Sequence, residues 1–100
     1  MTLLPIEVHP DAAAEAGTAV QWYRERNEAA ANAFLAELDR AMKMIAERPQ
    51  MWPEYVGGTR RFLLRHFPFS VVYRRRSENI QVIAIAHGRR KPGYWKNRIA

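Results

Sequence analysis

The sequence contains no cysteine and no long apolar run. Without cysteine the chain forms no disulfide bonds and offers no thiolate ligands to a metal ion. A membrane-spanning helix needs about 20 consecutive apolar residues, and because the apolar runs here are much shorter, we expect no membrane partner. The N-terminus also lacks the basic segment and apolar stretch of a secretory signal peptide. These absences predict a cytoplasmic protein.

Metal and phosphate motifs are missing as well. The three histidines, His9, His66 and His87, fall on different predicted elements and show no paired ligand spacing. The glycine pair at 57 and 58 precedes a predicted strand and lacks the downstream lysine of a phosphate-binding loop. We therefore expect no metal site and no cofactor.

Acidic residues are scarce in the second half of the chain. The sequence has 16 Lys and Arg residues against 10 Asp and Glu residues, which gives a net charge of +6. From Arg60 to the C-terminus, Glu78 is the only acidic residue. A basic protein of this kind favours an acidic partner, either a nucleic acid or an acidic protein segment. The C-terminal half is therefore the cationic half.

The first half of the chain predicts a short strand and two helices. Residues 3–8 alternate in polarity and contain a proline, which favours an edge strand. Pro10 suits a first helical turn, Asn27 marks a break, and Pro49 ends the second helix. Two helices with so short a connection pack antiparallel. The predicted buried stripes are Ala13, Ala16, Val20 and Tyr23 in the first helix, and Ala31, Phe34, Leu35, Leu38, Ala41, Met42 and Ile45 in the second.

The second half predicts three antiparallel strands after a connecting loop at 50–58. These strands span residues 59–65, 69–74 and 80–87. The last is apolar on both alternating faces, which is typical of a strand covered on both sides, so we expect it in a central position. The expected fold class is therefore α+β: an N-terminal edge strand, an antiparallel helical hairpin packed on a three-stranded antiparallel meander, and a short C-terminal tail. One domain of this size covers residues 1–100.

Three segments add a family resemblance to this order of elements. They are Arg61-Phe62-Leu63-Leu64, Phe67-Pro68-Phe69-Ser70-Val71-Val72-Tyr73 and Ala86-His87-Gly88-Arg89-Arg90, which closes on Tyr94-Trp95. With these features the chain resembles the RelE/ParE superfamily, the toxin half of bacterial type II toxin-antitoxin modules. The resemblance implies a RelE/ParE-like fold, a cognate antitoxin, a hetero-oligomer with it, and a role such as plasmid stabilization.

The superfamily holds two activities on one fold. RelE-like members cut messenger RNA in the ribosomal A site, and their catalytic residues carry over onto Arg61, Arg89 or Arg90, and Tyr94. His87 is a further candidate acid or base for that reaction. Two catalytic cations of that branch are missing here, because Leu63 and Ser70 stand in their places. ParE-like members instead inhibit DNA gyrase by binding it and need no catalytic residues. This chain resembles the ParE branch more closely, which predicts a gyrase inhibitor. The alternatives are a RelE-like ribonuclease, which would be the only enzyme among these functions, and a nontoxic basic module that binds nucleic acid.

Two sets of binding residues are predicted. The target-binding set is His87, Arg89, Arg90, Lys91, Tyr94 and Trp95, and the antitoxin-binding set is Ala12, Ala16, Phe34, Arg61, Arg65 and Arg74. For Trp95 the alternative is that the tail folds back and the ring packs on the sheet. Small helix residues leave shallow grooves, and a cationic sheet end attracts an acidic segment of the antitoxin. From the residues alone, a solvated basic turn is the favoured interpretation of the cluster at 89–91, and the family resemblance reverses that preference. His87 is equally a structural histidine that caps the strand.

Overall fold

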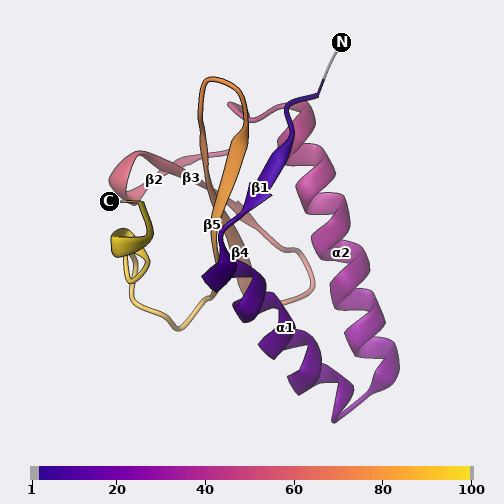
Figure 1. The fold of residues 1–100 in the computed structure, drawn as a ribbon. Coiled ribbons are helices and arrows are strands. Elements are labelled where there is room, and N and C mark those ends of the chain that lie inside the picture. Colours follow the sequence, from indigo (N-terminus) through magenta and orange to yellow (C-terminus); the bar gives the residue numbers. More distant parts are fainter. Residues whose placement is uncertain (1–2, 100) are drawn as a thin grey trace.

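The computed structural model describes residues 3–99 and shows two helices against one mixed five-stranded sheet (Figure 1). The elements are β1 (Ile6–Val8), α1 (Pro10–Arg24), α2 (Glu28–Glu47), β2 (Glu54–Tyr55), β3 (Thr59–Leu63), β4 (Phe69–Arg75) and β5 (Ile80–His87), with 3-10 helices η1 (Val56–Gly58) and η2 (Lys96–Ile99). The predicted α+β class is confirmed. The predicted domain also includes residues 1, 2 and 100, which lie outside the described part. Neither helix in residues 3–99 has the length and apolar composition that a membrane span requires.

Local side chains set the helix ends where the sequence predicts them. At the start of α1, the Nδ1 atom of His9 accepts the backbone N–H of Asp11 at 3.0 Å. At the start of α2, the side-chain oxygen of Asn27 accepts the backbone N–H groups of residues 29 and 30. Such caps satisfy donors that have no partner within the helix. α2 ends at Glu47, close before Pro49.

The predicted stripe of α1 is partly wrong. Ala13 is exposed, whereas Ala12 and Ala19 are buried with Val20. Alanines fill several consecutive positions of this helix, so its apolar face is poorly defined by spacing alone. Packing of α1 on β5 decides which alanines are covered. In α2 the predicted stripe is buried or half-buried except for Leu35, which is 42% exposed.

The sheet order is β1-β5-β4-β3-β2. The short β1 is an edge strand, as predicted, and it pairs in parallel with β5, with Ile6 opposite Ile80. β5 therefore lies between two strands and is not an edge strand, as predicted, but the central strand of the sheet is β4. The fifth strand, β2, was predicted as loop. It consists of two residues, Glu54 and Tyr55, and pairs with the start of β3. A segment of two residues is too short to show the alternation that identifies a strand in a sequence.

β3 ends at Leu63, two residues earlier than the sequence predicts. The backbone N–H groups of Arg65 and His66 donate to the Glu37 carboxylate on α2 and not to a neighbouring strand. The His66 Nδ1 atom lies 2.7 Å from the same carboxylate. The buried Glu37 side chain thus replaces the next hydrogen bonds between β3 and β4, and the chain turns toward β4.

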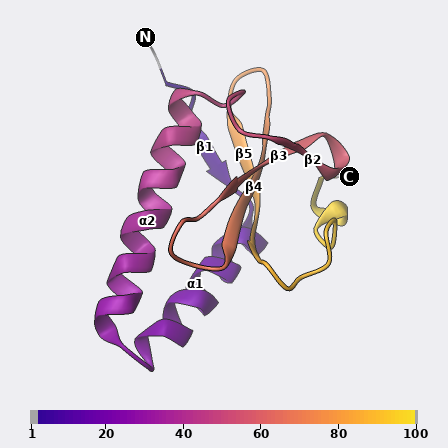
Figure 2. The same cartoon turned by 180° about the vertical axis from the view of Figure 1, so that it is seen from behind.

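The sheet is covered differently on its two faces, with the helices on one and the C-terminal tail (residues 92–99) on the other (Figures 1 and 2). The helix-side core contains Phe34, Leu38, Ile45, Val71, Tyr73, Ile80, Val82 and Ile85. On the opposite face, Val72, Ile83 and Ala84 pack under Trp95 of the tail. A register shift beside Val72 leaves Ile83 without a partner in β4 and reverses the alternation of β5. Past this bulge, Ile85 faces the helices.

Candidate functional site

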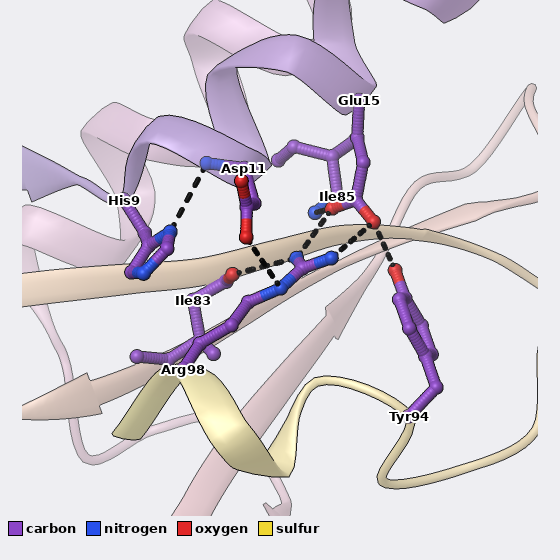
Figure 3. A network of polar contacts seen from close by, with 7 residues as sticks. All are labelled: His9, Asp11, Glu15, Ile83, Ile85, Tyr94 and Arg98. Atoms are coloured by element: carbon purple, nitrogen blue, oxygen red, sulfur yellow. Dashed lines mark hydrogen bonds and ion pairs between the residues drawn. The ribbon is translucent and has the colours of Figure 1, made fainter. Parts of the chain in front are cut away.

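A polar network fixes the tail against α1 and β5 (Figure 3). Both terminal nitrogens of Arg98 donate to the Glu15 carboxylate, at 2.9 and 3.0 Å. The Tyr94 hydroxyl donates to Glu15 at 2.6 Å, and the backbone N–H of Ile85 donates to it at 3.0 Å. Arg98 also donates to the carbonyl of Ile83. One carboxylate therefore joins three segments of the chain.

The charge states of this network follow from its contacts. Burial alone would raise the pKa of Glu15, but the hydrogen bonds from Arg98, Tyr94 and the Ile85 backbone outweigh it and lower the pKa. The pKa of Tyr94 is raised, first by burial and then by Glu15. At neutral pH, Glu15 is a carboxylate and Tyr94 is a neutral donor. The Tyr94 proton is held in this bond.

The loop of residues 88–91, called here the cationic loop, follows β5 directly. Its first amide, Gly88 N–H, donates to the carbonyl of Pro68 at 2.7 Å. The Nδ1 atom of His87 accepts the Arg89 N–H at 3.0 Å, so this histidine caps the turn. The guanidinium of Arg90 stacks on the Tyr94 ring, 3.8 Å from its centroid. These contacts give an exposed loop a defined backbone.

The cations of this loop are not neutralised. Arg89, Arg90 and Lys91 are exposed, and none of them forms an ion pair within residues 3–99. The positive charges of this loop repel one another, and the approach of an acidic partner offsets this repulsion. The loop is therefore a surface suited to an anionic group.

Two hollows flank the cationic loop. The larger, called the α1 groove, has a volume of about 560 Å³ and lies between α1 and the ends of β4 and β5; its lining includes Thr18, Ala19, Trp22, Tyr23, Phe69 and Ile85. The smaller, called the sheet hollow, has a volume of about 110 Å³ on the tail side; its lining includes Arg61, Ser70, Ala86, Lys91 and Trp95. His87, Arg90 and Tyr94 border both hollows. The loop thus separates an apolar groove from a cationic hollow.

The structure brings most of the predicted target-binding residues together and corrects one of them. His87, Arg89, Arg90 and Lys91 are contiguous, and Tyr94 stacks beside them. Trp95 has no exposed surface, because its ring is the centre of the tail-side core. Its predicted contact with a target is therefore wrong for this conformation, and its role is packing.

The predicted antitoxin-binding residues do not form one surface. Ala12 and Phe34 are completely buried in the helix-side core, so a direct contact with a partner is wrong for both. Of the four that retain exposure, Arg61 lines the sheet hollow and Arg74 donates to Gln81. The remaining two are Ala16, which is half-buried on α1, and Arg65, which is exposed in the turn after β3.

Sequence reasoning missed two structural carboxylates, Glu15 and Glu37. Glu37 is 8% exposed, and although burial raises its pKa, hydrogen bonds from His66 and the Arg65 backbone give a net lowering. The burial of Glu37 could have been predicted from its position, because it lies at helical spacing from Phe34 and Ala41 on the buried stripe of α2. No group of three His, Asp or Glu side chains in residues 3–99 is arranged to hold a metal ion.

Comparison with known proteins shows which family this chain resembles. A protein-family model described as "ParE toxin of type II toxin-antitoxin system, parDE" matches residues 6–92. A solved structure described as "Chromosomal ParDE TA system from P. aeruginosa" matches with a TM-score of 0.75 and 20% sequence identity, over 85% of this chain and 96% of that chain. At that identity the structural match concerns the fold alone. No curated protein matches this chain.

A helical hairpin on a five-stranded mixed sheet, with a cationic loop directly after β5, defines the class as a RelE/ParE-superfamily toxin. Within that class the family match covers most of the chain, and the chain belongs to the ParE toxin family of type II toxin-antitoxin systems. The predicted resemblance is confirmed, and so is the choice of the ParE branch at the level of the family.

Proposed function

We propose that this chain acts by binding DNA gyrase through the cationic loop and that a cognate antitoxin neutralises it. The observation that carries the proposal is the combination of exposed, unpaired cations with a fixed backbone at residues 88–91. A preorganised charged loop gains affinity because little conformational entropy is lost when it binds. Charge complementarity also speeds encounter with an acidic surface.

Binding accounts for the site better than catalysis does. The Tyr94 hydroxyl donates to Glu15 and its pKa is raised, so it is poorly suited to deliver or take up a proton near neutral pH. Leu63 is 61% exposed where the RelE-like branch has a lysine, and the arginine position of that branch holds the buried Ser70. Each missing cation would cost about two orders of magnitude in rate.

One observation favours the ribonuclease alternative. Arg61, His87, Arg90 and Tyr94, which belong to different segments, line the same sheet hollow. These are four of the five residues that the RelE-like alternative assigns to catalysis. The two functions are therefore best separated by experiment on the target.

The first test measures DNA supercoiling by purified gyrase in the presence of the purified chain. We expect loss of supercoiling activity that deepens as the chain is added. In parallel, transcript 5′ ends are mapped soon after the chain is induced without antitoxin, and we expect growth arrest with intact messages. Cuts at the ribosomal A site with unaffected gyrase would establish the ribonuclease. Normal growth would favour a nontoxic nucleic-acid-binding module.

The α1 groove is the proposed antitoxin site. It is mainly apolar, and Trp22 beside it is 51% exposed with the Arg26 guanidinium 3.7 Å from its ring centroid. Arg90 lies at the other border of the groove. An amphipathic segment with apolar anchors and flanking carboxylates complements this surface. The groove replaces the buried Ala12 and Phe34 as the contact surface on the helical hairpin.

Filling the groove should release the toxin from its antitoxin. In Thr18→Tyr a ring occupies the groove, and we expect antitoxin affinity to fall about thirtyfold, as for a clash of about 2 kcal/mol. Toxicity should persist even when the antitoxin is co-expressed. The matched control is Ala36→Tyr, at a position on α2 that is also exposed and does not line the groove. Equal affinity of both variants for the antitoxin would remove the groove from the interface.

A further inference from the structure

We propose that His87 is the positioning residue of the cationic loop and that its protonation weakens binding of the target at acidic pH. The imidazole lies at the end of β5, where the loop begins, and its Nδ1 atom accepts the backbone N–H of Arg89 at 3.0 Å. The part of this inference that concerns the target rests on the proposed function. The part that concerns the loop is measurable on the chain alone.

The hydrogen bond to Arg89 defines the protonation state of the His87 ring. A ring nitrogen that accepts a hydrogen bond carries no proton, so the proton of the neutral ring is on Nε2. In the protonated imidazole both nitrogens are donors and neither accepts. Protonation of His87 therefore breaks this bond and sets two N–H donors against each other.

Aromatic packing holds the His87 ring in its orientation. The ring lies edge-to-face with that of Phe69, which is opposite His87 in the β4–β5 register, with 5.0 Å between the ring centroids and 83° between the ring planes. Phe69 in turn packs on Phe34 of the helix-side core at 5.3 Å. Because this contact keeps Nδ1 directed at the loop, the protonated ring opposes the Arg89 amide where the neutral ring binds it.

The surroundings of His87 offer little compensation for a positive charge on its ring. The ionisable side chains that border the same two hollows are Glu15 and Tyr23 of α1, Tyr55 of β2, Arg61 of β3, Arg90 and Lys91 of the cationic loop, and Tyr94 of the tail. Glu15 is the one carboxylate among these lining residues, and it already accepts hydrogen bonds from Tyr94 and Arg98. A charge on His87 therefore adds repulsion to the loss of the bond.

The other bonds of the loop do not involve the His87 ring. The Gly88 N–H donates to the carbonyl of Pro68, and the Arg90 N–H donates to the backbone carbonyl of His87 at 2.9 Å. Protonation therefore releases the Arg89 amide and leaves the rest of the loop bonded. A less ordered loop loses more conformational entropy when it binds, so its affinity falls. The extra exposed charge offsets little of this loss, because salt screens it.

The first measurement is a pH titration of the full chain alone, followed by ¹H–¹⁵N NMR. Imidazole rings change their charge between about pH 5 and 8. At about pH 8 we expect Nδ1 of His87 to resonate as an unprotonated ring nitrogen. As the pH falls, the amide resonance of Arg89 should shift together with the resonances of the His87 ring. A protonated Nδ1 at the higher pH, or an Arg89 amide that does not follow the ring, would overturn the inference.

The second measurement is binding of the fluorescently labelled chain to purified gyrase at about pH 5.5 and about pH 8. For the unaltered chain we expect a dissociation constant about fivefold higher at the acidic pH, as for one lost cap of about 1 kcal/mol. In His87→Asn the side-chain oxygen can accept the amide two positions on and does not titrate, so this increase should disappear. His87→Leu has no acceptor at either pH and should bind weakly at both. Comparing the ratio between the two pH values across variants removes changes in gyrase itself.

The matched control is His9→Asn. His9 also caps a backbone amide through its Nδ1 atom, at the start of α1, and this variant should keep the pH dependence of the unaltered chain. Equal ratios for the unaltered chain and His87→Asn would contradict the role of His87. If the unaltered chain binds gyrase at neither pH, the proposed target is wrong, and the NMR titration then decides whether His87 positions the loop.

Discussion

A chain carrying both Arg89→Glu and Arg90→Glu should no longer arrest growth. Both side chains are exposed in the cationic loop, and the change reverses the charge of the surface proposed to meet the target. Two reversed contacts at a binding centre cost about 3–4 kcal/mol together, which weakens binding by roughly 10²–10³. The measurement is growth after induction without antitoxin, together with inhibition of gyrase supercoiling by the purified variant.

The control for this variant changes charge equally elsewhere. Arg40→Glu with Arg75→Glu alters two exposed arginines that form no ion pair within residues 3–99. It should arrest growth as the unaltered chain does. Because Arg89 and Arg90 are exposed, the variant that reverses them should also keep a melting temperature close to that of the unaltered chain. Full toxicity of the Arg89 and Arg90 variant would exclude the cationic loop from the mechanism.

Glu15→Gln should lower the melting temperature by about 10 °C or more. The change removes the negative charge from a carboxylate that is 18% exposed and leaves Arg98, which is 12% exposed, without its closest anion. Removing one member of a buried pair costs about 3 kcal/mol, and a domain of this size loses about 4 °C for each kcal/mol. The measurement is thermal unfolding followed by circular dichroism at neutral pH.

The same variant should lose part of the acid sensitivity of the fold. The pKa of Glu15 is lowered in the folded chain, so its stabilising contribution is complete above the ordinary value of 4.5 and disappears as pH falls through the lower folded value. The unaltered chain should therefore lose more stability than Glu15→Gln does when the pH falls from neutral to acid. Glu37, whose pKa is also lowered, contributes equally to both and cancels in the difference.

Asp39→Asn is the matched control for the Glu15 prediction. Asp39 pairs with Lys43 at 3.0 Å, but both side chains are mostly exposed. Exposed pairs contribute less than about 1 kcal/mol, so its melting temperature should change by no more than about 4 °C. If Glu15→Gln behaved in the same way, the network of Figure 3 would not be what holds the tail.

Much of the fold was predictable because its signals act over a few residues. Asn27 caps α2 through amides two and three positions away, and Pro49 blocks the helix just before it. The apolar pattern of β5 indicated a strand with neighbours on both sides, and the structure places it between β1 and β4. The cationic loop was visible as a run of charge.

The candidate site was only partly predictable. The sequence placed His87 and the cations after the last strand, but it could not show that Trp95 turns inward or that a groove opens beside α1. β2 was missed because two residues carry no periodicity, and only the neighbouring β3 makes them a strand.

The sequence by itself determined the helix ends, the long strands and the cationic half of the chain, because caps, prolines and periodicity act within one or two turns. The tertiary structure alone decided which alanines are buried and that Glu15 holds the tail against α1 and β5. Glu15 meets Tyr94 and Arg98 at separations of 79 and 83 residues. No local pattern encodes such a contact. It exists because the fold brings β5 and the tail to the Glu15 carboxylate of α1, where burial makes the charge costly unless its donors are present.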